Sequence, residues 1–381
     1  MSIQVLKPVF DIDACLTQVR ECLEKNWTGM GFKTVEFEEL WKKYTGLENA
    51  YFVNSCTAAL NLAFDVLKLK NKWEDGDEVI STPLTFISTN HAIARAKLHP
   101  VFADVDDTMC LDPDDVKRKI TNKTRAICFV AFGGNTGRYK EIVNICKENN
   151  IALVLDAAHM SGTRLDGEIP GKEADVVCWS YQAVKNLPTG DSGMVCFKNK
   201  EYDTLARELA WCGINKDTYA RVSNGGTYKW KYDVEYIGEK YNGNAIMAGI
   251  AIAQLPHLDK DNAYRRLLAK WYKEIFSANE NIKNKIKFVR VPDNCECSQH
   301  IFQIFVENRD ALLEFLNKND IYPGVHYITN TDYRMYSYGK GTCPNAEYAS
   351  AHVISLPLHL QLTYEDVKYI ANIIIDFLSK N

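Results

Sequence analysis

From residue 50 to residue 198, short apolar runs alternate with amphipathic segments. The runs have the length of strands, and the segments between them repeat their apolar positions with the period of a helix. We therefore predict strands at 50–54, 78–82, 100–105, 125–132, 152–157, 175–181 and 194–198. Several of these strands are apolar on both faces, which is typical of a mostly parallel sheet between helices. The pattern predicts an α/β fold.

The flanking segments predict further helices and a second, smaller unit. Helices are expected at 10–24 and 35–45, and a helix at 245–260 closes the large domain. From about residue 258 a long helix leads into a unit with strands at 286–291, 299–306 and 352–356 and a last helix at 363–379. Because 381 residues exceed the usual size of one core, we expect a large domain at 1–257 and a smaller C-terminal α/β domain at 258–381.

Composition and charge argue against several classes of function. The formal net charge is -4 and no block of like charges occurs, which disfavours a nucleic acid partner. No apolar stretch reaches membrane-spanning length and the N-terminus lacks a signal-peptide pattern, so we expect a cytoplasmic protein without a membrane partner. The 12 cysteines are scattered, as in a reducing compartment. Cys295 and Cys297 have no second pair nearby at zinc spacing, and no metal site is expected.

A lysine stands between two of the apolar runs. Lys185 lies on a glycine-rich turn that links the strands predicted at 175–181 and 194–198. A partly desolvated lysine has a lowered pKa and becomes a nucleophile toward aldehydes. Taken alone, Lys185 is more simply interpreted as a lysine at a strand end with its ammonium group in water.

Two upstream features decide between these readings. Asp156 ends a buried strand, where a carboxylate is costly unless a cation meets it, and the protonated ring nitrogen of pyridoxal phosphate (PLP) is such a cation. Residues 54–57 begin a helix with small and hydroxyl side chains, and a helix N-terminus favours a phosphate group. Such caps are common for structural reasons alone. Together with Lys185, however, the three features indicate a PLP site.

Further motifs surround these features in a fixed order. They lie at 27–31, 35–38, 55–60, 76–79, 85–89, 100–105, 156–159, 180–185, 189–193, 324–327 and 356–359. In order and spacing they resemble the DegT/DnrJ/EryC1/StrS family of fold-type I PLP-dependent sugar aminotransferases. The resemblance covers almost the whole chain and implies a large domain with a mostly parallel central sheet between helices, plus a smaller C-terminal α/β domain.

The resemblance also implies roles for single residues. Lys185 is expected to form the Schiff base with the cofactor and to move the substrate proton, and Asp156 to pair with the ring nitrogen. Phe86 is expected to stack on the ring, and His159 to lie beside its phenolic oxygen. The phosphate is expected to be held by three further residues, namely Cys56, Thr57 and Ser180.

One segment departs from the family pattern. Lys240 stands where the family often has an asparagine that reaches the phosphate of the neighbouring subunit, and Asn242 replaces an arginine. Which of the two side chains points inward is open. Because this segment acts across a subunit boundary, the resemblance implies a homodimer with shared active sites.

The substrate side is less defined. By resemblance, Thr28, Gly29, His326 and Tyr327 lie near the sugar, and the polar, aromatic stretch 217–233 is expected to form a lid over a nucleotide. The chain is thus expected to transfer an amino group, with L-glutamate as donor, to a keto group of a nucleotide-linked deoxysugar. Another ketone, such as a small phosphorylated ketone or a cyclitol, stays open as acceptor. A sugar dehydratase of the same family would carry histidine in place of Lys185, and a cofactor-binding protein without turnover would not need Lys185 and Asp156.

Overall fold

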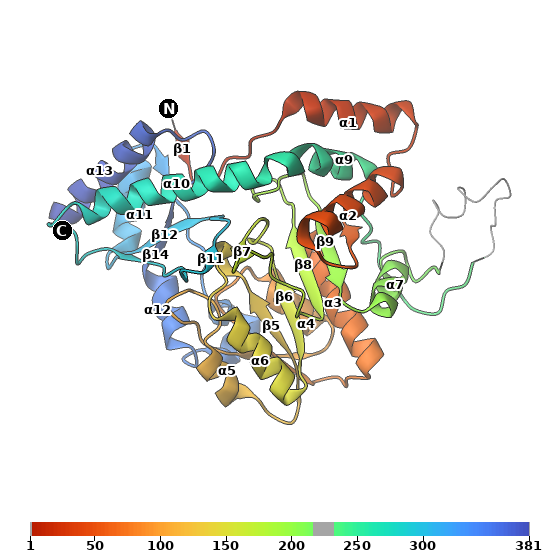
Figure 1. Ribbon diagram of the computed structural model, residues 1–381. Helices are drawn as coiled ribbons and strands as arrows, with labels where there is room; N and C mark the ends of the chain where they lie inside the picture. The colour runs from red at the N-terminus through yellow and green to blue at the C-terminus, as the bar shows by residue number, and fades with distance from the viewer. Residues whose placement is uncertain (1, 216–231, 381) are drawn as a thin grey trace.

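The computed structural model describes residues 2–215 and 232–380. Its central sheet has seven strands: β2 (Tyr51–Val53), β3 (Glu78–Ser81), β4 (His99–Phe102), β5 (Thr124–Val130), β6 (Ala152–Asp156), β8 (Val176–Ser180) and β9 (Gly193–Phe197). Their order is β2-β9-β8-β6-β5-β3-β4. Of these strands, β9, β8, β6 and β5 are labelled side by side in Figure 1. From β8 to β4 all neighbours are parallel, whereas β9 runs antiparallel to β8 and β2. The predicted α/β fold with a mostly parallel sheet is confirmed.

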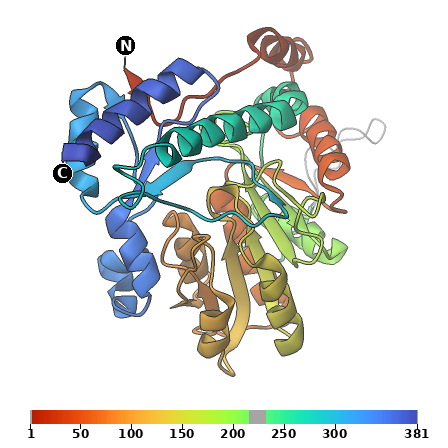
Figure 2. The same ribbon diagram turned by 60° about the vertical axis from the view of Figure 1, so that its left-hand side comes forward.

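The chain after residue 257 builds a second, smaller sheet. The long helix α10 (Leu258–Ser277) leads into three antiparallel strands, β10 (Lys287–Phe288), β12 (Phe302–Phe305) and β14 (Val353–Leu356). Figure 2 shows the helices α10, α11 (Arg309–Lys318) and α13 (Tyr364–Lys380) of this part of the chain. They contribute to a separate group of buried side chains, which includes Ile304 and Ile370. The domain boundary between residues 257 and 258 stays a prediction.

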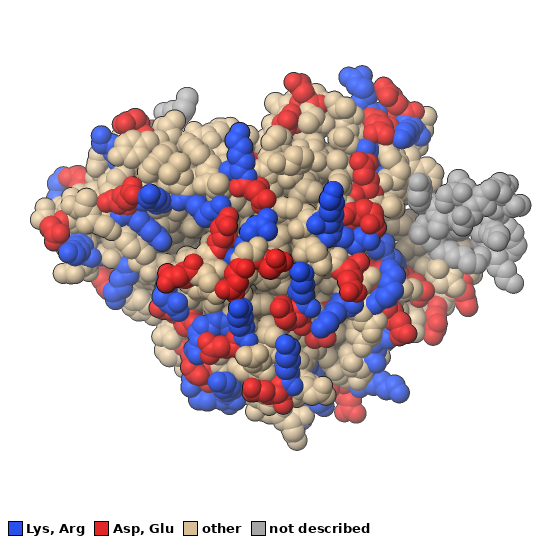
Figure 3. Space-filling view, in the orientation of Figure 1, with Lys and Arg blue, Asp and Glu red and all other residues tan. Residues whose placement is uncertain are grey.

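Shorter elements connect these two parts. Strand β1 (Ile3–Gln4) pairs with β13 (Ile321–Tyr322), and β7 (Arg164–Leu165) pairs with β11 (Cys295–Glu296). Other elements outside the sheets include α1 (Ile12–Glu24), α12 (Pro344–His352), and the 3-10 helices η1 (Phe132–Gly134), η2 (Leu255–His257), η3 (Asn330–Asp332) and η4 (Arg334–Gly339). On the face shown in Figure 3, cationic and anionic side chains are interspersed, in keeping with 45 Lys and Arg against 49 Asp and Glu.

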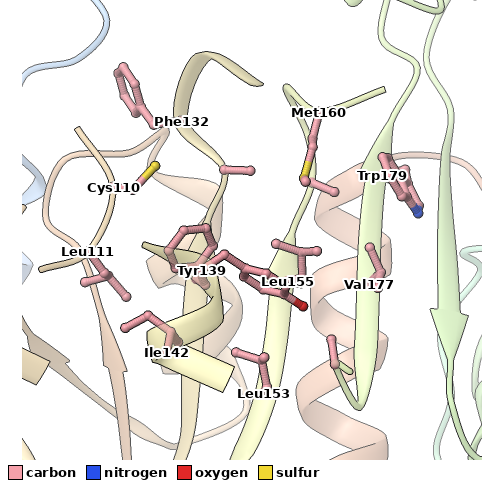
Figure 4. Close-up of a cluster of buried hydrophobic side chains, with 14 of the residues drawn as sticks. Cys110, Leu111, Phe132, Tyr139, Ile142, Leu153, Leu155, Met160, Val177 and Trp179 are labelled. Atoms are coloured by element: carbon pink, nitrogen blue, oxygen red, sulfur yellow. The ribbon is translucent and has the colours of Figure 1, made fainter. Parts of the chain in front are cut away.

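Both faces of the central sheet are buried, because successive residues of a strand point to opposite sides. In β6, Leu153 and Leu155 pack into one core and Val154 into the other. The first core, part of which is shown in Figure 4, includes side chains from α2 (Phe32–Thr45), α5 (Pro113–Lys119), α6 (Tyr139–Asn149) and α9 (Ala245–Gln254). The second includes side chains from α3 (Cys56–Asn71), α4 (Ser88–Arg95) and α7 (Lys200–Leu209). This is why the strands read as continuous apolar runs.

One predicted helix is wrong in its extent. The helix expected at 245–260 ends at Gln254, and η2 separates it from α10. Pro256 lies in η2, and proline lacks the N–H of the helical ladder and clashes with the preceding turn. The predicted strands are all present, with ends that differ by a few residues.

Candidate active site

Loops at the carboxyl ends of the parallel strands line a cavity of about 450 Å³. Open α/β sheets bind ligands at this edge, and the volume suits a small organic cofactor. The cavity brings together most of the side chains expected from the sequence, which come from several distant segments: Cys56, Thr57, Phe86, Asp156, His159, Ser180, Lys185, His326 and Tyr327.

Lys185 enters this cavity from the turn between β8 and β9. Its backbone N–H donates to the carbonyl of Gln182 at 2.8 Å, which closes the turn. Its side chain is only partly exposed, and burial lowers the pKa of the amine to about 8, although Cys56 and Asp156 act in the opposite direction. The share of neutral, nucleophilic amine close to physiological pH is therefore much larger than for a lysine with the ordinary pKa of 10.5, although the ammonium still predominates.

Asp156 is held rigidly at the end of β6 and is 3% exposed. The hydroxyl of Thr89 donates to its Oδ2 at 2.8 Å, and the N–H of Ala158 donates to its Oδ1 at 3.2 Å. Burial raises the pKa of Asp156, whereas these two hydrogen bonds and Lys185 lower it. A carboxylate with this little water around it gains from a cationic partner such as a protonated ring nitrogen.

The start of α3 forms a cradle of backbone amides. Ser55 caps the helix, and its hydroxyl accepts from the N–H of Ala58, which leaves the amides of Cys56 and Thr57 for a ligand. Gly193 lies directly beneath: a Cβ there would stand 2.6 Å from the carbonyl carbon of Ser55 and 2.7 Å from the nitrogen of Cys56. The close approach of β9 to α3 therefore requires glycine. Ser180 completes the cradle, which fits a phosphate group.

Aromatic rings line the opposite part of the cavity. His159 accepts from the N–H of Gly133 at its Nδ1, and its Nε2 lies 3.2 Å from the hydroxyl of Tyr327. The ring of Phe86 is 57% exposed and lies 6.1 Å from that of Tyr327. A large apolar ring left open to a cavity is suited to stacking on a flat heteroaromatic ligand.

His326 is anchored from the smaller sheet. Its Nδ1 is 2.8 Å from the hydroxyl of Ser355 in β14, and its carbonyl accepts from Gln303 in β12. Burial, followed by the nearby Lys185, lowers the pKa of His326 to about 4. His326 is therefore a neutral hydrogen-bonding group in this cavity.

Four of the expected residues lie away from the cavity within one chain. The carbonyls of Thr28 and Gly29 both accept from the N–H of Ala245 at the start of α9. The ammonium of Lys240 lies over the ring of Trp211, 3.0 Å from its centroid, and the Nδ2 of Asn242 donates to a neighbouring carbonyl. Their expected roles stay predictions. Most of the predicted lid at 217–233 lies outside the residues that the structure describes.

The cavity also contains side chains to which the sequence patterns assigned no role. His300, just before β12, lies 3.5 Å from the amine of Lys185, and Thr89 holds Asp156. Gln182 and Asp191 line the cavity as well. In the sequence, the position of His300 next to the apolar run at 301–306 was the available signal. Nothing in the local sequence connects this histidine with Lys185, which lies 115 positions earlier.

Comparison with known proteins settles the class. A family model described as the DegT/DnrJ/EryC1/StrS aminotransferase family matches residues 11–375. The chain belongs to this family. The resemblance drawn from its motifs is thus confirmed, and the chain is a sugar aminotransferase of the DegT/DnrJ/EryC1/StrS family.

Two relatives of this DegT/DnrJ/EryC1/StrS aminotransferase have informative names. The spore coat polysaccharide biosynthesis protein SpsC of Bacillus subtilis is 31% identical over 364 residues, which is 92% of this chain and 91% of that protein. The dTDP-4-dehydro-2,3,6-trideoxy-D-glucose 4-aminotransferase of Saccharopolyspora spinosa is 31% identical over 365 residues, which is 94% of this chain and 92% of that protein.

Solved structures agree with this assignment. The aminotransferase TlmJ from Streptoalloteichus hindustanus superposes with a TM-score of 0.90 at 29% identity and covers 100% of both chains. Spr1654 from Streptococcus pneumoniae, solved in a PLP form, has a TM-score of 0.89 at 26% identity and covers 100% of this chain and 99% of that chain. The cofactor of this enzyme is PLP. The amide cradle, the open Phe86 ring, Asp156 and Lys185 together fit that cofactor.

Two further properties of the described residues concern membranes and metal ions. Within 2–215 and 232–380, no helix is long and apolar enough to cross a membrane. In the same ranges, no group of three or more His, Cys, Asp or Glu side chains is placed to hold a metal ion.

Proposed function

We propose that this aminotransferase moves an amino group from L-glutamate onto a keto group of a nucleotide-linked deoxysugar. The observation that carries the chemical part of this proposal is the meeting of Lys185, Asp156 and the first turn of α3 in one cavity. An amine with a lowered pKa, a buried carboxylate and an anion cradle each match a different part of PLP.

The proposed roles follow from the position of each side chain. When bound, PLP supplies an aldehyde for the amino group and a ring that withdraws electrons. Lys185 provides the amine that holds the aldehyde and the base that moves the substrate proton. Asp156, fixed by Thr89, keeps the ring nitrogen protonated. The amides of Cys56 and Thr57 hold the phosphate, and Phe86, His159 and Ser180 complete the cofactor site.

The acceptor is proposed from the relatives. One of them is named for amination of a dTDP-linked ketosugar, and another for polysaccharide synthesis. His326 and Tyr327 add neutral hydrogen-bonding groups beside Lys185, as sugar hydroxyls require. A product destined for a surface polysaccharide or another glycoconjugate would follow. Another ketone is the alternative, whereas the dehydratase reading is disfavoured by the lysine at position 185.

A second copy of the chain is proposed to complete the site. Among the described residues that line the cavity, Lys185 is the only lysine or arginine, and in the proposed role its amino group is committed to the aldehyde of the cofactor. The phosphate dianion would then be met by amides and hydroxyls alone. Lys240, from a neighbouring subunit in a homodimer, would add a cation, and Thr28 and Gly29 would reach the sugar from the same side.

The cysteines support a reducing compartment. All 12 are free thiols, and Cys56, Cys128 and Cys178 are buried in the core of the large sheet. We therefore propose that the enzyme acts in the cytoplasm.

Measuring the two half-reactions separately tests the proposal. The PLP-loaded enzyme is mixed with L-glutamate, and 2-oxoglutarate release is measured together with the absorbance of the cofactor. The aminated enzyme is then offered dTDP- and UDP-linked 4-ketosugars, a small phosphorylated ketone and a keto-cyclitol. We expect turnover with one of the nucleotide-linked sugars and none in Lys185→Ala. Turnover only with a ketone that lacks a nucleotide would refute the proposed acceptor.

A further inference from the structure

His300 is a buried histidine to which the proposed reaction gives no role. It is 2% exposed, and its Nε2 lies 3.5 Å from the Nζ of Lys185. Its other ring nitrogen, Nδ1, lies 2.9 Å from the side-chain oxygen of Asn186. Lys185 and Asn186 are adjacent in the sequence, so one turn of chain engages both nitrogens of the imidazole.

The bonds of Asn186 decide which ring nitrogen carries the proton. Its Nδ2 donates to the side-chain oxygen of Asn262 at 2.6 Å and to the carbonyl of Ser298 at 2.8 Å. Asn262 in turn uses its own Nδ2 to donate to the carbonyl of Ser161. Both amides are thus fixed in orientation, and the Oδ1 of Asn186 accepts from Nδ1–H of His300. The Nε2 of His300 is left as a lone pair facing Lys185.

A second proton on the ring is strongly disfavoured. Burial lowers the pKa of His300 well below its ordinary value, and Lys185 and then His159 and His326 act in the same direction. The ring of His159 lies 4.4 Å from that of His300, centroid to centroid. A proton on His300 would therefore place a charge beside the lysine and against another imidazole. The ring is a neutral acceptor.

We infer that His300 is a positioning residue for Lys185: its Nε2 accepts a hydrogen bond from the amino group and so holds that group in one orientation in the cavity. The inference rests on the proposal that Lys185 is the reactive amine. A neutral acceptor suits both forms of the lysine, since the ammonium and the free amine can each donate to it. The bond from the ammonium is the stronger of the two.

Two substitutions with side chains of similar size test the two ring nitrogens of His300 separately. In His300→Asn the amide nitrogen takes the place of Nδ1 and can still donate to Asn186, but nothing reaches Lys185. In His300→Gln the longer amide takes the place of Nε2, and its oxygen can accept from Lys185. Each apoprotein is labelled with acetic anhydride over a series of pH values, and the peptide that carries Lys185 is quantified by mass spectrometry. Turnover of the PLP-loaded proteins and their melting temperatures are measured in parallel.

We expect His300→Asn to move the labelling midpoint of Lys185 down by about one pH unit, because an acceptor for the ammonium is lost. Its kcat should fall about tenfold or more, as expected for a misplaced reacting group, with the KM for L-glutamate little changed. His300→Gln should restore both quantities in part.

An unchanged midpoint and kcat in His300→Asn would overturn the inference. Equal losses in both variants, with equal falls in melting temperature, would also overturn it, because they would identify a packing residue. Failure of the proposed function looks different: Lys185→Ala would retain turnover. If Lys185→Ala is inactive while both His300 variants behave as wild type, the proposed function stands and only the role of His300 is lost.

Discussion

Replacement of Lys185 by methionine should stabilise the folded apoprotein near neutral pH. The pKa of Lys185 falls from its ordinary value of 10.5 to about 8 in the folded protein, because the ammonium is partly withdrawn from water. At ~1.36 kcal/mol per pKa unit, this shift corresponds to roughly 3 kcal/mol of destabilisation. Part of the side chain faces the cavity, where water weakens the effect, so we expect a gain of about 1–3 kcal/mol in Lys185→Met. Methionine has a similar volume, which keeps the packing cost small.

The sign of the pH dependence distinguishes this effect from a general change in packing. Below the folded pKa of about 8 the lysine is charged in both states, and the folded state bears the full cost. As the pH rises from about 8 to 10.5, the folded lysine loses its proton first and the cost disappears. The free energy of unfolding of wild type should therefore approach that of Lys185→Met as the pH rises through this range.

Urea unfolding of the two apoproteins at equal protein concentration, at about pH 7 and about pH 10, measures the difference. Lys172→Met is the control, because the Lys172 side chain is 53% exposed on the surface. This control should change the free energy of unfolding little at either pH. A Lys185→Met protein that is no more stable than wild type at about pH 7, or whose advantage is the same at both pH values, would refute the reasoning.

Further predictions concern the cofactor site and the dimer. Asp156→Asn should lower kcat roughly 100-fold or more, since an amide does not keep the ring nitrogen protonated; kcat near the wild-type value would assign that role elsewhere. Thr89→Val removes a donor from Asp156 and should cost about tenfold in kcat, measured with saturating L-glutamate. Gly193→Ala forces β9 away from the start of α3 and should weaken PLP binding about 10–100-fold by titration, whereas unchanged affinity would disconnect the cradle from the phosphate. If the site is shared, an equal mixture of Lys185→Ala and Lys240→Glu chains, after subunit exchange, should recover up to about a quarter of wild-type activity; activity equal to the mean of the separate variants would contradict a shared site.

The sequence by itself determined the large sheet and the edge of it at which we propose that the cofactor binds. A strand that is buried on both faces has a continuous apolar run in the sequence. Such a run can be recognised without knowledge of the neighbouring strands. Asp156 ends one of those runs and Lys185 lies on the turn after another, and parallel topology then places both at the carboxyl edge. The end of the helix near Pro256 could also have been predicted from the local sequence, because proline interrupts a helix. The predicted helix nevertheless extended beyond it, because the apolar period continues through this position.

The tertiary structure decided which distant side chains act together. Thr89 reaches Asp156 across 67 positions, Tyr327 reaches His159 across 168, and His300 reaches Lys185 across 115. The local pattern of hydrophobic and polar residues does not encode such pairs, because each residue obeys only the periodicity of its own strand or loop. Burial on folding then lowers the pKa of Lys185, and the bonds of Asn186 fix the tautomer of His300. The sequence supplied the reactive groups. The packing of the two sheets, which together surround one cavity, set the protonation states and orientations of these groups.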